Sequence, residues 1–372
     1  MKDGKLCGDE GKLGTISFKE ARVLEVISQR KDLTEIKVEL EGEISSAINY
    51  DRLTGDIKPG DKVVLNTTAV ELELGTGGKH FVLWNYAHRS TSPQHPGHIM
   101  KLRYTPLQLK CLSVEEQESP FHQLMRESMD LEGMPVIVGT LHSQLPAVVT
   151  TVKAINGEAK MAYIMTDGAA LPIAFSNLVH KLKSLKLLDA TITIGHAFGG
   201  DLEAVNIFSG LIACKVVIQA DITVVIMGPG TVGTDTLLGF SAMEQGQIIN
   251  AIASLNGYPI AIPRIGFKDK RARHIGVSHH TITVLSKGTL VSCVVTLPRM
   301  SRWKMEMVLH KLKEFGIASK HRIEIIENGV TLKALKRFGF DDVTTMGRGI
   351  EEEPEFFQAA GAAGIYALSL LK

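Results

Sequence analysis

The strongest constraint on the fold is an alternation of short apolar runs with longer segments of helical character, which begins near residue 134. This alternation is typical of an α/β fold with parallel strands, because a crossover helix must separate each strand from the next one that pairs with it. The runs end roughly 30 residues apart, which leaves room for such helices. The predicted strands are 134–139, 161–166, 190–194, 222–227 and 259–262.

The region before residue 90 has a different periodicity. Residues 35–41 and 70–74 alternate apolar and charged side chains, as half-buried strands do, and Gly- and Pro-containing turns separate such runs. We therefore predict a small β-barrel over residues 1–100, followed by a three-layer α/β domain with a mostly parallel sheet over residues 101–372. A proline- and histidine-rich connector near residues 90–99 marks the boundary.

Charge and composition exclude several classes of protein. The 41 Lys and Arg residues balance 40 Asp and Glu residues, so no overall field attracts nucleic acid or an anionic membrane. The predicted barrel has no basic stripe with interleaved aromatic residues, which makes nucleic acid the least favoured partner. The apolar stretches 211–230 and 356–371 are interrupted or too short to cross a bilayer, and the polar first residues contain no secretory signal. We expect a cytoplasmic protein with no membrane partner.

The residues that follow the predicted strands indicate a ligand site, because ligands of open parallel sheets bind beyond the carboxyl ends of the strands. His142 and His196 each follow a strand, and Asp167 and Asp201 lie in the same kind of position. Turns are rich in Gly and Asp in any case, but they do not require histidine. We therefore predict that these four residues belong to a functional edge.

The fourth strand is followed by Gly228-Pro229-Gly230-Thr231-Val232-Gly233-Thr234, which fits the pattern G-x-G-x-x-G. Backbone N–H groups of such loops hold phosphate. A dinucleotide site would also require an acid after the next strand, where this chain has Pro263-Arg264. The pattern therefore favours phosphate or carboxylate over nicotinamide or flavin. The residues predicted to bind the anion here are Gly228, Gly230, Thr231, Gly233 and Thr234.

The segment 263–280 is strongly basic, with one acid, Asp269. Arginine forks suit phosphate and carboxylate, so we predict that Arg271, Arg273 and His274 bind an anion, although a solvated charge run is the alternative. If residues 281–285 form an antiparallel strand, His279 and His280 come close to His196. Arg348, after a further predicted strand at 342–346, either joins the same edge or lies in a surface turn.

Metal binding is the second prediction for this edge, because imidazole and carboxylate groups suit Zn²⁺, Mn²⁺ or Fe²⁺. The spacing is not diagnostic, and the same histidines would also serve as general acids, anion donors or packed core residues. No G-x-S-x-G, HExxH or P-loop lysine is present, which disfavours serine hydrolases, zincins and nucleoside triphosphatases. The predicted metal ligands are His196, Asp201, His279 and His280.

Several long motifs carry a resemblance to a known family. They are GTLHSQ at 139–144, MTDG at 165–168, GHAFGGDLEAV at 195–205, IGVSHH at 275–280, MGRG at 346–349 and HIMKLRYTP at 98–106. With these motifs the chain resembles an uncharacterised bacterial family labelled domain of unknown function 3866, over nearly all of its length after residue 15. The resemblance implies a cytoplasmic bacterial protein of this architecture, and it brings no reaction, cofactor or catalytic residue.

The sequence therefore predicts an enzyme that acts on a small phosphorylated or carboxylated metabolite at the carboxyl edge of the sheet, with the possible help of a divalent metal. In this hypothesis Arg271 and Arg273 hold the anion. The residues predicted to bind metal or move protons are His196, Asp201, His279 and His280. The alternative is a non-catalytic protein that senses a metabolite. A homodimer is expected only because it is the commonest assembly.

Overall fold

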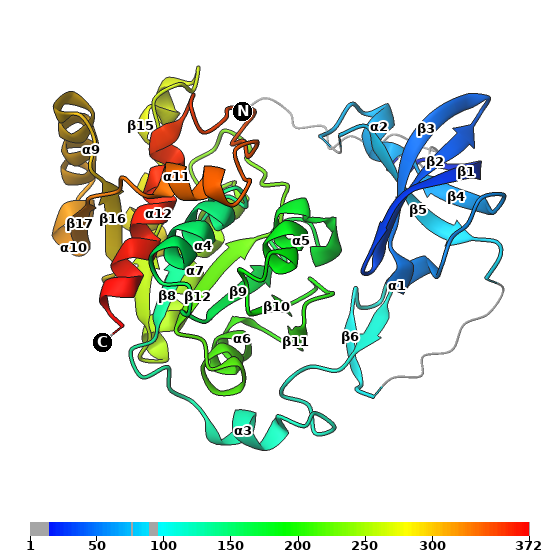
Figure 1. The fold of residues 1–372 in the computed structure, drawn as a ribbon, viewed down its shortest axis with the longest axis horizontal. Helices are drawn as coiled ribbons and strands as arrows, with labels where there is room; N and C mark the ends of the chain where they lie inside the picture. The colour runs from blue at the N-terminus through cyan, green and yellow to red at the C-terminus, as the bar shows by residue number, and fades with distance from the viewer. Residues whose placement is uncertain (1–14, 76, 89–95, 372) are drawn as a thin grey trace, which may run out of the picture. The chain divides into compact units, whose positions relative to one another are not determined.

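The computed structural model describes residues 15–75, 77–88 and 96–371. The chain divides into two compact units, residues 1–94 and 95–372 (Figure 1). The first unit contains a closed β-barrel, and the second contains an eight-stranded sheet with helices on its faces. The predicted combination of a small barrel and a three-layer α/β domain is confirmed. No helix among the described residues is long and apolar enough to span a membrane.

The barrel has the strand order β1-β2-β3-β5-β4 and closes by antiparallel pairing of β4 with β1. The alternation seen in the sequence places Ile36, Val38 and Leu40 of β2 in its core. Its elements are β1 (Phe18–Arg30), β2 (Leu33–Leu40), β3 (Glu43–Asn49), α1 (Asp51–Thr54), β4 (Lys62–Asn66), α2 (Thr68–Glu71) and β5 (Lys79–Asn85).

The strand predicted at residues 70–74 is wrong. The carbonyl of Thr67 accepts hydrogen bonds from Val70 and Glu71, so the chain turns into the short helix α2 directly after β4. The Glu71 carboxylate accepts a further bond from the Thr67 hydroxyl at 2.8 Å. Local hydrogen bonds therefore override an alternating pattern, and Leu72 and Leu74 of that pattern are exposed.

The sheet of the second unit is parallel throughout, in the order β11-β10-β9-β12-β8-β13-β16-β17. All five apolar runs predicted as parallel strands are strands. The short strand β11 and the apolar strand β16 were not predicted. The strands are β8 (Pro135–Val138), β9 (Met161–Thr166), β10 (Ala190–Ile194), β11 (Leu202–Ala204), β12 (Ile222–Met227), β13 (Tyr258–Ala261), β16 (Val294–Pro298) and β17 (Arg322–Ile326).

Helices cover both faces of this sheet. α4, α11 and α12 pack against one another, and α6 packs against α7 (Figure 1). The chain moves in opposite directions along the sheet through α4 and through α6, so right-handed crossovers place these helices on opposite faces. The helices of this unit are α3 (His122–Glu127), α4 (Gln144–Ile155), α5 (Asn177–Ser184), α6 (Ile207–Ala213), α7 (Glu244–Ser254), α8 (His279–Thr283), α9 (Arg302–Glu314), α10 (Ile317–Lys320), α11 (Thr331–Arg337) and α12 (Pro354–Ser369).

Two further strand predictions are wrong. Residues 281–285, expected as an antiparallel strand, lie in α8 and the π-helical turn Val284–Gly288 that follows it. The Ser278 hydroxyl begins this helix by accepting a hydrogen bond from the His280 amide. Residues 342–346 are irregular apart from a single bridge between Thr345 and Arg348. Small hairpins outside the main sheet pair β6 (Ile99–Lys101) with β7 (Leu109–Cys111) and β14 (Ile265–Gly266) with β15 (Gly276–Val277).

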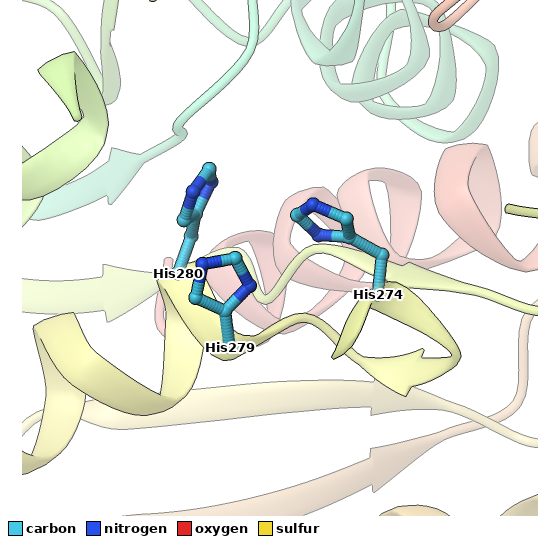
Figure 2. A group of neighbouring side chains, drawn as sticks. All are labelled: His274, His279 and His280. Carbon is cyan, nitrogen blue, oxygen red and sulfur yellow. The ribbon is translucent and has the colours of Figure 1, made fainter. Parts of the chain in front are cut away.

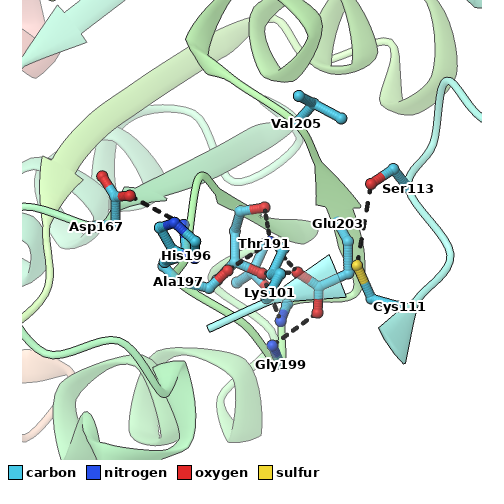
Figure 3. A network of polar contacts seen from close by, with 12 residues as sticks. Lys101, Cys111, Ser113, Asp167, Thr191, His196, Ala197, Gly199, Glu203 and Val205 are labelled. Atoms are coloured by element: carbon cyan, nitrogen blue, oxygen red, sulfur yellow. Dashed lines mark hydrogen bonds and ion pairs between the residues drawn. The ribbon is translucent and has the colours of Figure 1, made fainter. Parts of the chain in front are cut away.

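A buried ion pair joins the β6–β7 hairpin to the edge of the sheet (Figure 3). Lys101 is 1% exposed, and its Nζ atom lies 2.7 Å from Oε2 of Glu203 on β11. The same ammonium donates to the carbonyls of Thr193 and Ala197. All three protons of this lysine therefore have acceptors, which is the condition for burying such a charge.

We expect the Lys101→Met substitution to lower the free energy of unfolding of the second unit by about 3–5 kcal/mol, because it leaves the Glu203 carboxylate buried without its cation. Denaturant unfolding followed by the fluorescence of Trp303 in a Trp84→Phe background reports on this unit alone, since the chain has 2 tryptophans. The double variant Lys101→Met, Glu203→Gln should recover part of the loss. A single variant as stable as the parent would contradict the role of the pair.

Candidate functional site

At the centre of the sheet, the chain changes the direction in which it moves from strand to strand. From β8 the chain proceeds to β9 on one side, and from β12, which lies between β9 and β8, it proceeds to β13 on the other side. Such a switch point leaves a crevice between diverging loops. Three loops begin at this place, after β8, β12 and β13, and the last of them carries the basic segment 263–280.

Three histidines from this basic segment form a cluster (Figure 2). His274 ends a 3₁₀ turn, and His279 and His280 are the first two residues of α8. One ring nitrogen from each lies within 4.8 Å of the other two. The centroids of the three rings are 4.2, 4.8 and 5.2 Å apart. The cluster is the only group of three or more potential metal-ligating side chains found among the described residues.

Burial keeps these imidazoles neutral. It lowers the pKa of His274 to about 3 and that of His280 to about 4, and the pKa of His279 is lowered as well. The nearby guanidinium of Arg264 adds to the effect at all three, because a second positive charge is unfavourable there. At neutral pH each ring therefore keeps a lone pair that can bind a cation.

The hydrogen bonds of the cluster fit a metal site. Nδ1 of His274 lies 2.8 Å from the Ser278 hydroxyl, which can fix the ring and leave Nε2 for a ligand. Nδ1 of His279 is buried and makes no close hydrogen bond among the described residues, while the backbone of Arg273 lies near the ring and favours its protonated form. A bound cation would satisfy such a weakly partnered nitrogen. Three neutral imidazoles with an open fourth position are a ligand set of catalytic zinc sites.

An arginine-rich ion-pair network lies beside the cluster. Asp269 accepts two hydrogen bonds of 3.0 Å from the side chain of Arg271, which holds the pKa of this aspartate well below its usual range. The guanidinium groups of Arg264 and Arg348 each approach the same carboxylate at 3.5 Å. Arg348 also pairs with Glu353 at 2.8 Å. Arg348 therefore lies with the basic segment at this site, and does not belong to an isolated surface turn.

The loop after β12 lies against the histidines. The ring of Phe240 stacks on His280 with centroids 4.0 Å apart and an interplanar angle of 13°. Gly233 pairs with Phe240, and a Cβ atom at Gly233 would lie 3.6 Å from the His280 ring. Arg273 forms an ion pair with Asp235 of the same loop. The basic segment and the glycine-rich loop are therefore neighbours, as a shared site requires.

The hydroxyls of that loop are used within it. Thr231 is hydrogen-bonded to Ser241 at 2.9 Å, and Thr234 donates to the carbonyl of Gly239 at 2.9 Å. Gly228 lies close to Ala170, where a Cβ atom would be 2.7 Å from the carbonyl oxygen, and Gly230 adopts a φ of +104°. Glycine is therefore required at both positions by the path of the backbone. Anion binding by this loop stays a prediction.

The predicted metal set of His196, Asp201, His279 and His280 is not brought together. Asp201 accepts hydrogen bonds of 2.9 Å from both the amide and the hydroxyl of Thr191, near the amino end of β10. His196 follows the carboxyl end of the same strand. The segment between them returns along β10 so that β11 can pair parallel with it, which moves Asp201 to the opposite edge of the sheet.

His196 itself has a structural contact (Figure 3). Its Nδ1 atom accepts a hydrogen bond of 3.0 Å from the amide of Leu102, and its own amide donates to Asp167 at 2.9 Å. The Nδ1 lone pair is therefore in use, and Nε2 lies 3.4 Å from Nη2 of Arg103, whose positive charge disfavours a metal ion there. The antiparallel strand that would have brought His279 to His196 is replaced by α8, and His279 and His280 join His274 instead.

His142 lies at the switch point between β8 and β12. Its Nδ1 atom is 3.1 Å from the carbonyl of Met227, and its Nε2 atom is 2.6 Å from the hydroxyl of Ser176. Burial lowers its pKa to about 4. With both nitrogens in hydrogen bonds and the side chain buried, His142 connects the loops after β8 and β12.

Sequence reasoning missed Glu244, the first residue of α7. The Thr166 hydroxyl donates a hydrogen bond to one oxygen of its carboxylate at 2.7 Å. A Cβ atom at position 168 would lie 2.6 Å from the other oxygen, so the glycine there makes room for the carboxylate. Burial, with a contribution from the charge of Asp167, raises its pKa to about 7. From the sequence, a glutamate in a helical segment is indistinguishable from an ordinary solvent-exposed residue. Only its position beside the end of β9 in the structure shows that its carboxylate is buried.

Comparison with known proteins identifies the family. Residues 46–364 match the family described as "Protein of unknown function (DUF3866)", and the chain belongs to it. The match confirms the resemblance seen in the motifs. No curated protein matches the chain. The family assigns no reaction, so the function must be inferred from the site.

Acid should destabilise the protein through His142. The unfolded histidine takes up a proton near pH 6.5 and the buried one only near pH 4, so the unfolded state binds more protons between these values. Stability should therefore fall as the pH is lowered through this window, by about 2–3 kcal/mol from this residue. Denaturant unfolding at both ends of the window should show a smaller loss for His142→Asn than for the wild type.

The exposed His310 of α9 provides the matched control. His310→Asn should keep the pH dependence of the wild type. Equal slopes in His142→Asn and the wild type would show that His142 is not the buried neutral group described here.

Proposed function

Because membership of a family of unknown function assigns no reaction, we propose from the site geometry that the chain is a metal-dependent enzyme for a small anionic metabolite. In this proposal His274, His279 and His280 hold a divalent cation. The observation that carries the proposal is the convergence of three neutral imidazoles, each with a ring nitrogen within 4.8 Å of the other two. Histidine ligands suit Zn²⁺ and other first-row divalent ions better than Mg²⁺ or Ca²⁺.

The arginines support an anionic substrate. A cation bound by three neutral rings beside Arg264, Arg271 and Arg273 would meet unfavourable positive charge, which Asp269 and Asp235 offset only in part. An anionic ligand between the cation and the guanidinium groups removes that conflict, because each positive group then faces a negative one. The same electrostatics that oppose a cation alone thus favour a cation together with an anionic substrate.

The roles of the chain's own groups follow from their positions. The arginines bind and orient the anion, and the Ser278 hydroxyl orients the His274 ring. A divalent cation supplies Lewis-acid polarisation of a substrate oxygen when it is bound. Hydrolysis, elimination and group transfer on an anionic metabolite all use this combination. The proposal therefore covers metal-assisted reactions as a class and does not choose among these three.

The rival proposal is a non-catalytic sensor that binds the same metabolite. Its support is the presence of a separate barrel unit in a chain whose ligand site belongs to the α/β unit. Nucleic acid remains the least favoured ligand. Five-stranded barrels of this kind bind oligonucleotides in other proteins, but the barrel lysines here pair with acids, as in Lys37–Glu25, Lys62–Glu20 and Lys79–Glu35. Cytoplasmic location, bacterial origin and homodimerisation stay predictions from the sequence.

We expect protein purified without chelator to contain about one transition-metal ion per chain, measured by elemental analysis. His279→Gln and His280→Gln should lose it, because each removes one of three ligands. The matched controls are His196→Gln and Asp201→Asn, which the sequence assigned to the metal set and which lie apart from the histidine cluster. Retention in the first pair and loss in the second would contradict the proposed ligands.

Ser278→Ala provides a graded test of the same site. It removes the hydroxyl that orients His274 and caps α8, and it deletes none of the three ligands, so metal affinity should fall about 10–100-fold without being abolished. Competition with a chromophoric chelator measures the affinity directly. An unchanged affinity would show that the Ser278 hydroxyl does not support a ligand.

Turnover distinguishes the enzyme from the sensor. Metal-loaded wild-type protein should consume a member of a panel of small phosphorylated and carboxylated metabolites, and His279→Gln should not. Mass spectrometry of the panel before and after incubation detects consumption without assuming a reaction. A compound that stabilises the wild-type protein and is recovered unchanged would favour the sensor and overturn the catalytic part of the proposal.

A further inference from the structure

We propose that the substrate is a small carboxylic acid, whose carboxylate binds in a cavity between Arg264 and Arg348, beside the histidine cluster. This inference rests on the proposed function and names the class of its substrate. The sequence had assigned anion binding to Arg271, Arg273 and the glycine-rich loop. The structure gives the central place to Arg264, which the sequence included in the basic segment but did not name among the anion ligands.

The cavity is small and partly open. Arg264 and Arg348 line it together with Asp269, Glu353, Thr345 and His274. These side chains come from two separate parts of the chain, the basic segment after β13 and the segment just before α12. Charged groups, together with Ile265, Gly266 and Phe356, thus line a hollow at the carboxyl edge of the sheet, where parallel α/β folds bind their ligands.

Arg264 is held rigidly at this cavity. Its amide donates to the Thr281 hydroxyl at 2.9 Å, and its carbonyl accepts from the Ser278 amide at 2.9 Å. Both partners flank the metal-site histidines His279 and His280. The backbone that positions the cluster therefore also positions this guanidinium.

The guanidinium of Arg264 has donors to spare. The side chain is only 10% exposed, yet its one polar contact with a described side chain is the 3.5 Å approach of Nη2 to Asp269. That carboxylate is already bound closely by Arg271. A guanidinium has five N–H donors, so most donors of Arg264 are left for a ligand at the cavity. An anion in the cavity would accept from them.

The side chains of the ion-pair network around Asp269 carry one more positive charge than negative charges. Three guanidinium groups, those of Arg264, Arg271 and Arg348, face two carboxylates, those of Asp269 and Glu353. Lys304 near this region is paired separately with Glu355. One further anion would balance the network, and in a partly buried place the balance of charge is strongly favoured.

A carboxylate fits this cavity better than a phosphate. The arginines already arrange themselves around the planar carboxylate of Asp269, and two guanidinium forks match a planar acceptor with two oxygens. The hollow encloses only about 10 Å³ and is partly open, so a ligand oxygen enters it and the rest of the ligand stays at its mouth. Because His274 belongs to both the cavity lining and the histidine cluster, the atoms next to the bound carboxylate lie on the side of the metal site.

The test measures binding of malonate and of inorganic phosphate by isothermal titration calorimetry, with full-length protein in its metal-free and zinc-loaded forms. Wild-type protein should bind malonate more tightly than phosphate in both forms. Arg264→Met, which keeps the length of the side chain and removes its charge, should weaken malonate binding at least about tenfold. Arg264→Lys should restore part of the affinity, because it returns the charge without the planar fork.

The matched control is Arg302→Met, at a side chain that is 93% exposed on α9, and it should bind malonate like the wild type. Zinc content is measured for every variant and should be unchanged in Arg264→Met and Arg264→Lys, which also shows that they are folded. Arg348→Met provides a second variant on the opposite side of the cavity and should also weaken malonate binding.

The outcomes separate this inference from the proposed function. Malonate binding that depends on Arg264 in the metal-free protein supports the cavity even if zinc does not bind. Zinc binding by the three histidines with no malonate binding, or with equal binding in Arg264→Met, overturns the cavity and leaves the metal site intact. Tighter binding of phosphate than of malonate overturns the assignment of the substrate as a carboxylic acid.

Discussion

Parallel pairing of β12 between β9 and β8 is the constraint on which the candidate site depends. It reverses the direction in which the chain crosses the sheet, so the loops after β8, β12 and β13 emerge side by side at the carboxyl edge. His142 joins the first two of these loops through the Met227 carbonyl, and Phe240 joins the last two through its stacking on His280. A ligand site assembled from residues far apart in the sequence follows directly from this order of strands.

Electrostatics then determines what this place can bind. Burial and the neighbouring arginines keep His274, His279 and His280 neutral, which suits them to bind a cation and makes them poor general acids. The arginines exceed the carboxylates beside them, which suits the surroundings to an anion. In the proposed function a metal ion and an anionic substrate would stabilise each other, because each removes the charge conflict that the other would create alone.

The parts of the structure that could be predicted are those determined by local periodicity. The apolar runs of β9, β10 and β12 match the strands residue for residue, because a buried strand must be apolar on both faces. The strands predicted at residues 70–74 and 281–285 are wrong, since local hydrogen bonds favour a helical turn: the Thr67 carbonyl and hydroxyl bond Glu71, and the Ser278 hydroxyl accepts from the His280 amide. The pattern of apolar residues does not reveal that such local hydrogen bonds compete with strand pairing.

The sequence by itself determined the two-part architecture, the parallel strands and the small set of loops where a site could form. It also identified the basic segment and its histidines as unusual. Only the tertiary structure decided which residues meet. It separated Asp201 from His196 because the chain turns back along β10, and it joined His274 to His279 and His280 because Ser278 begins a helix there. Contacts between distant residues depend on strand order and chain direction, which hydrophobic periodicity does not encode.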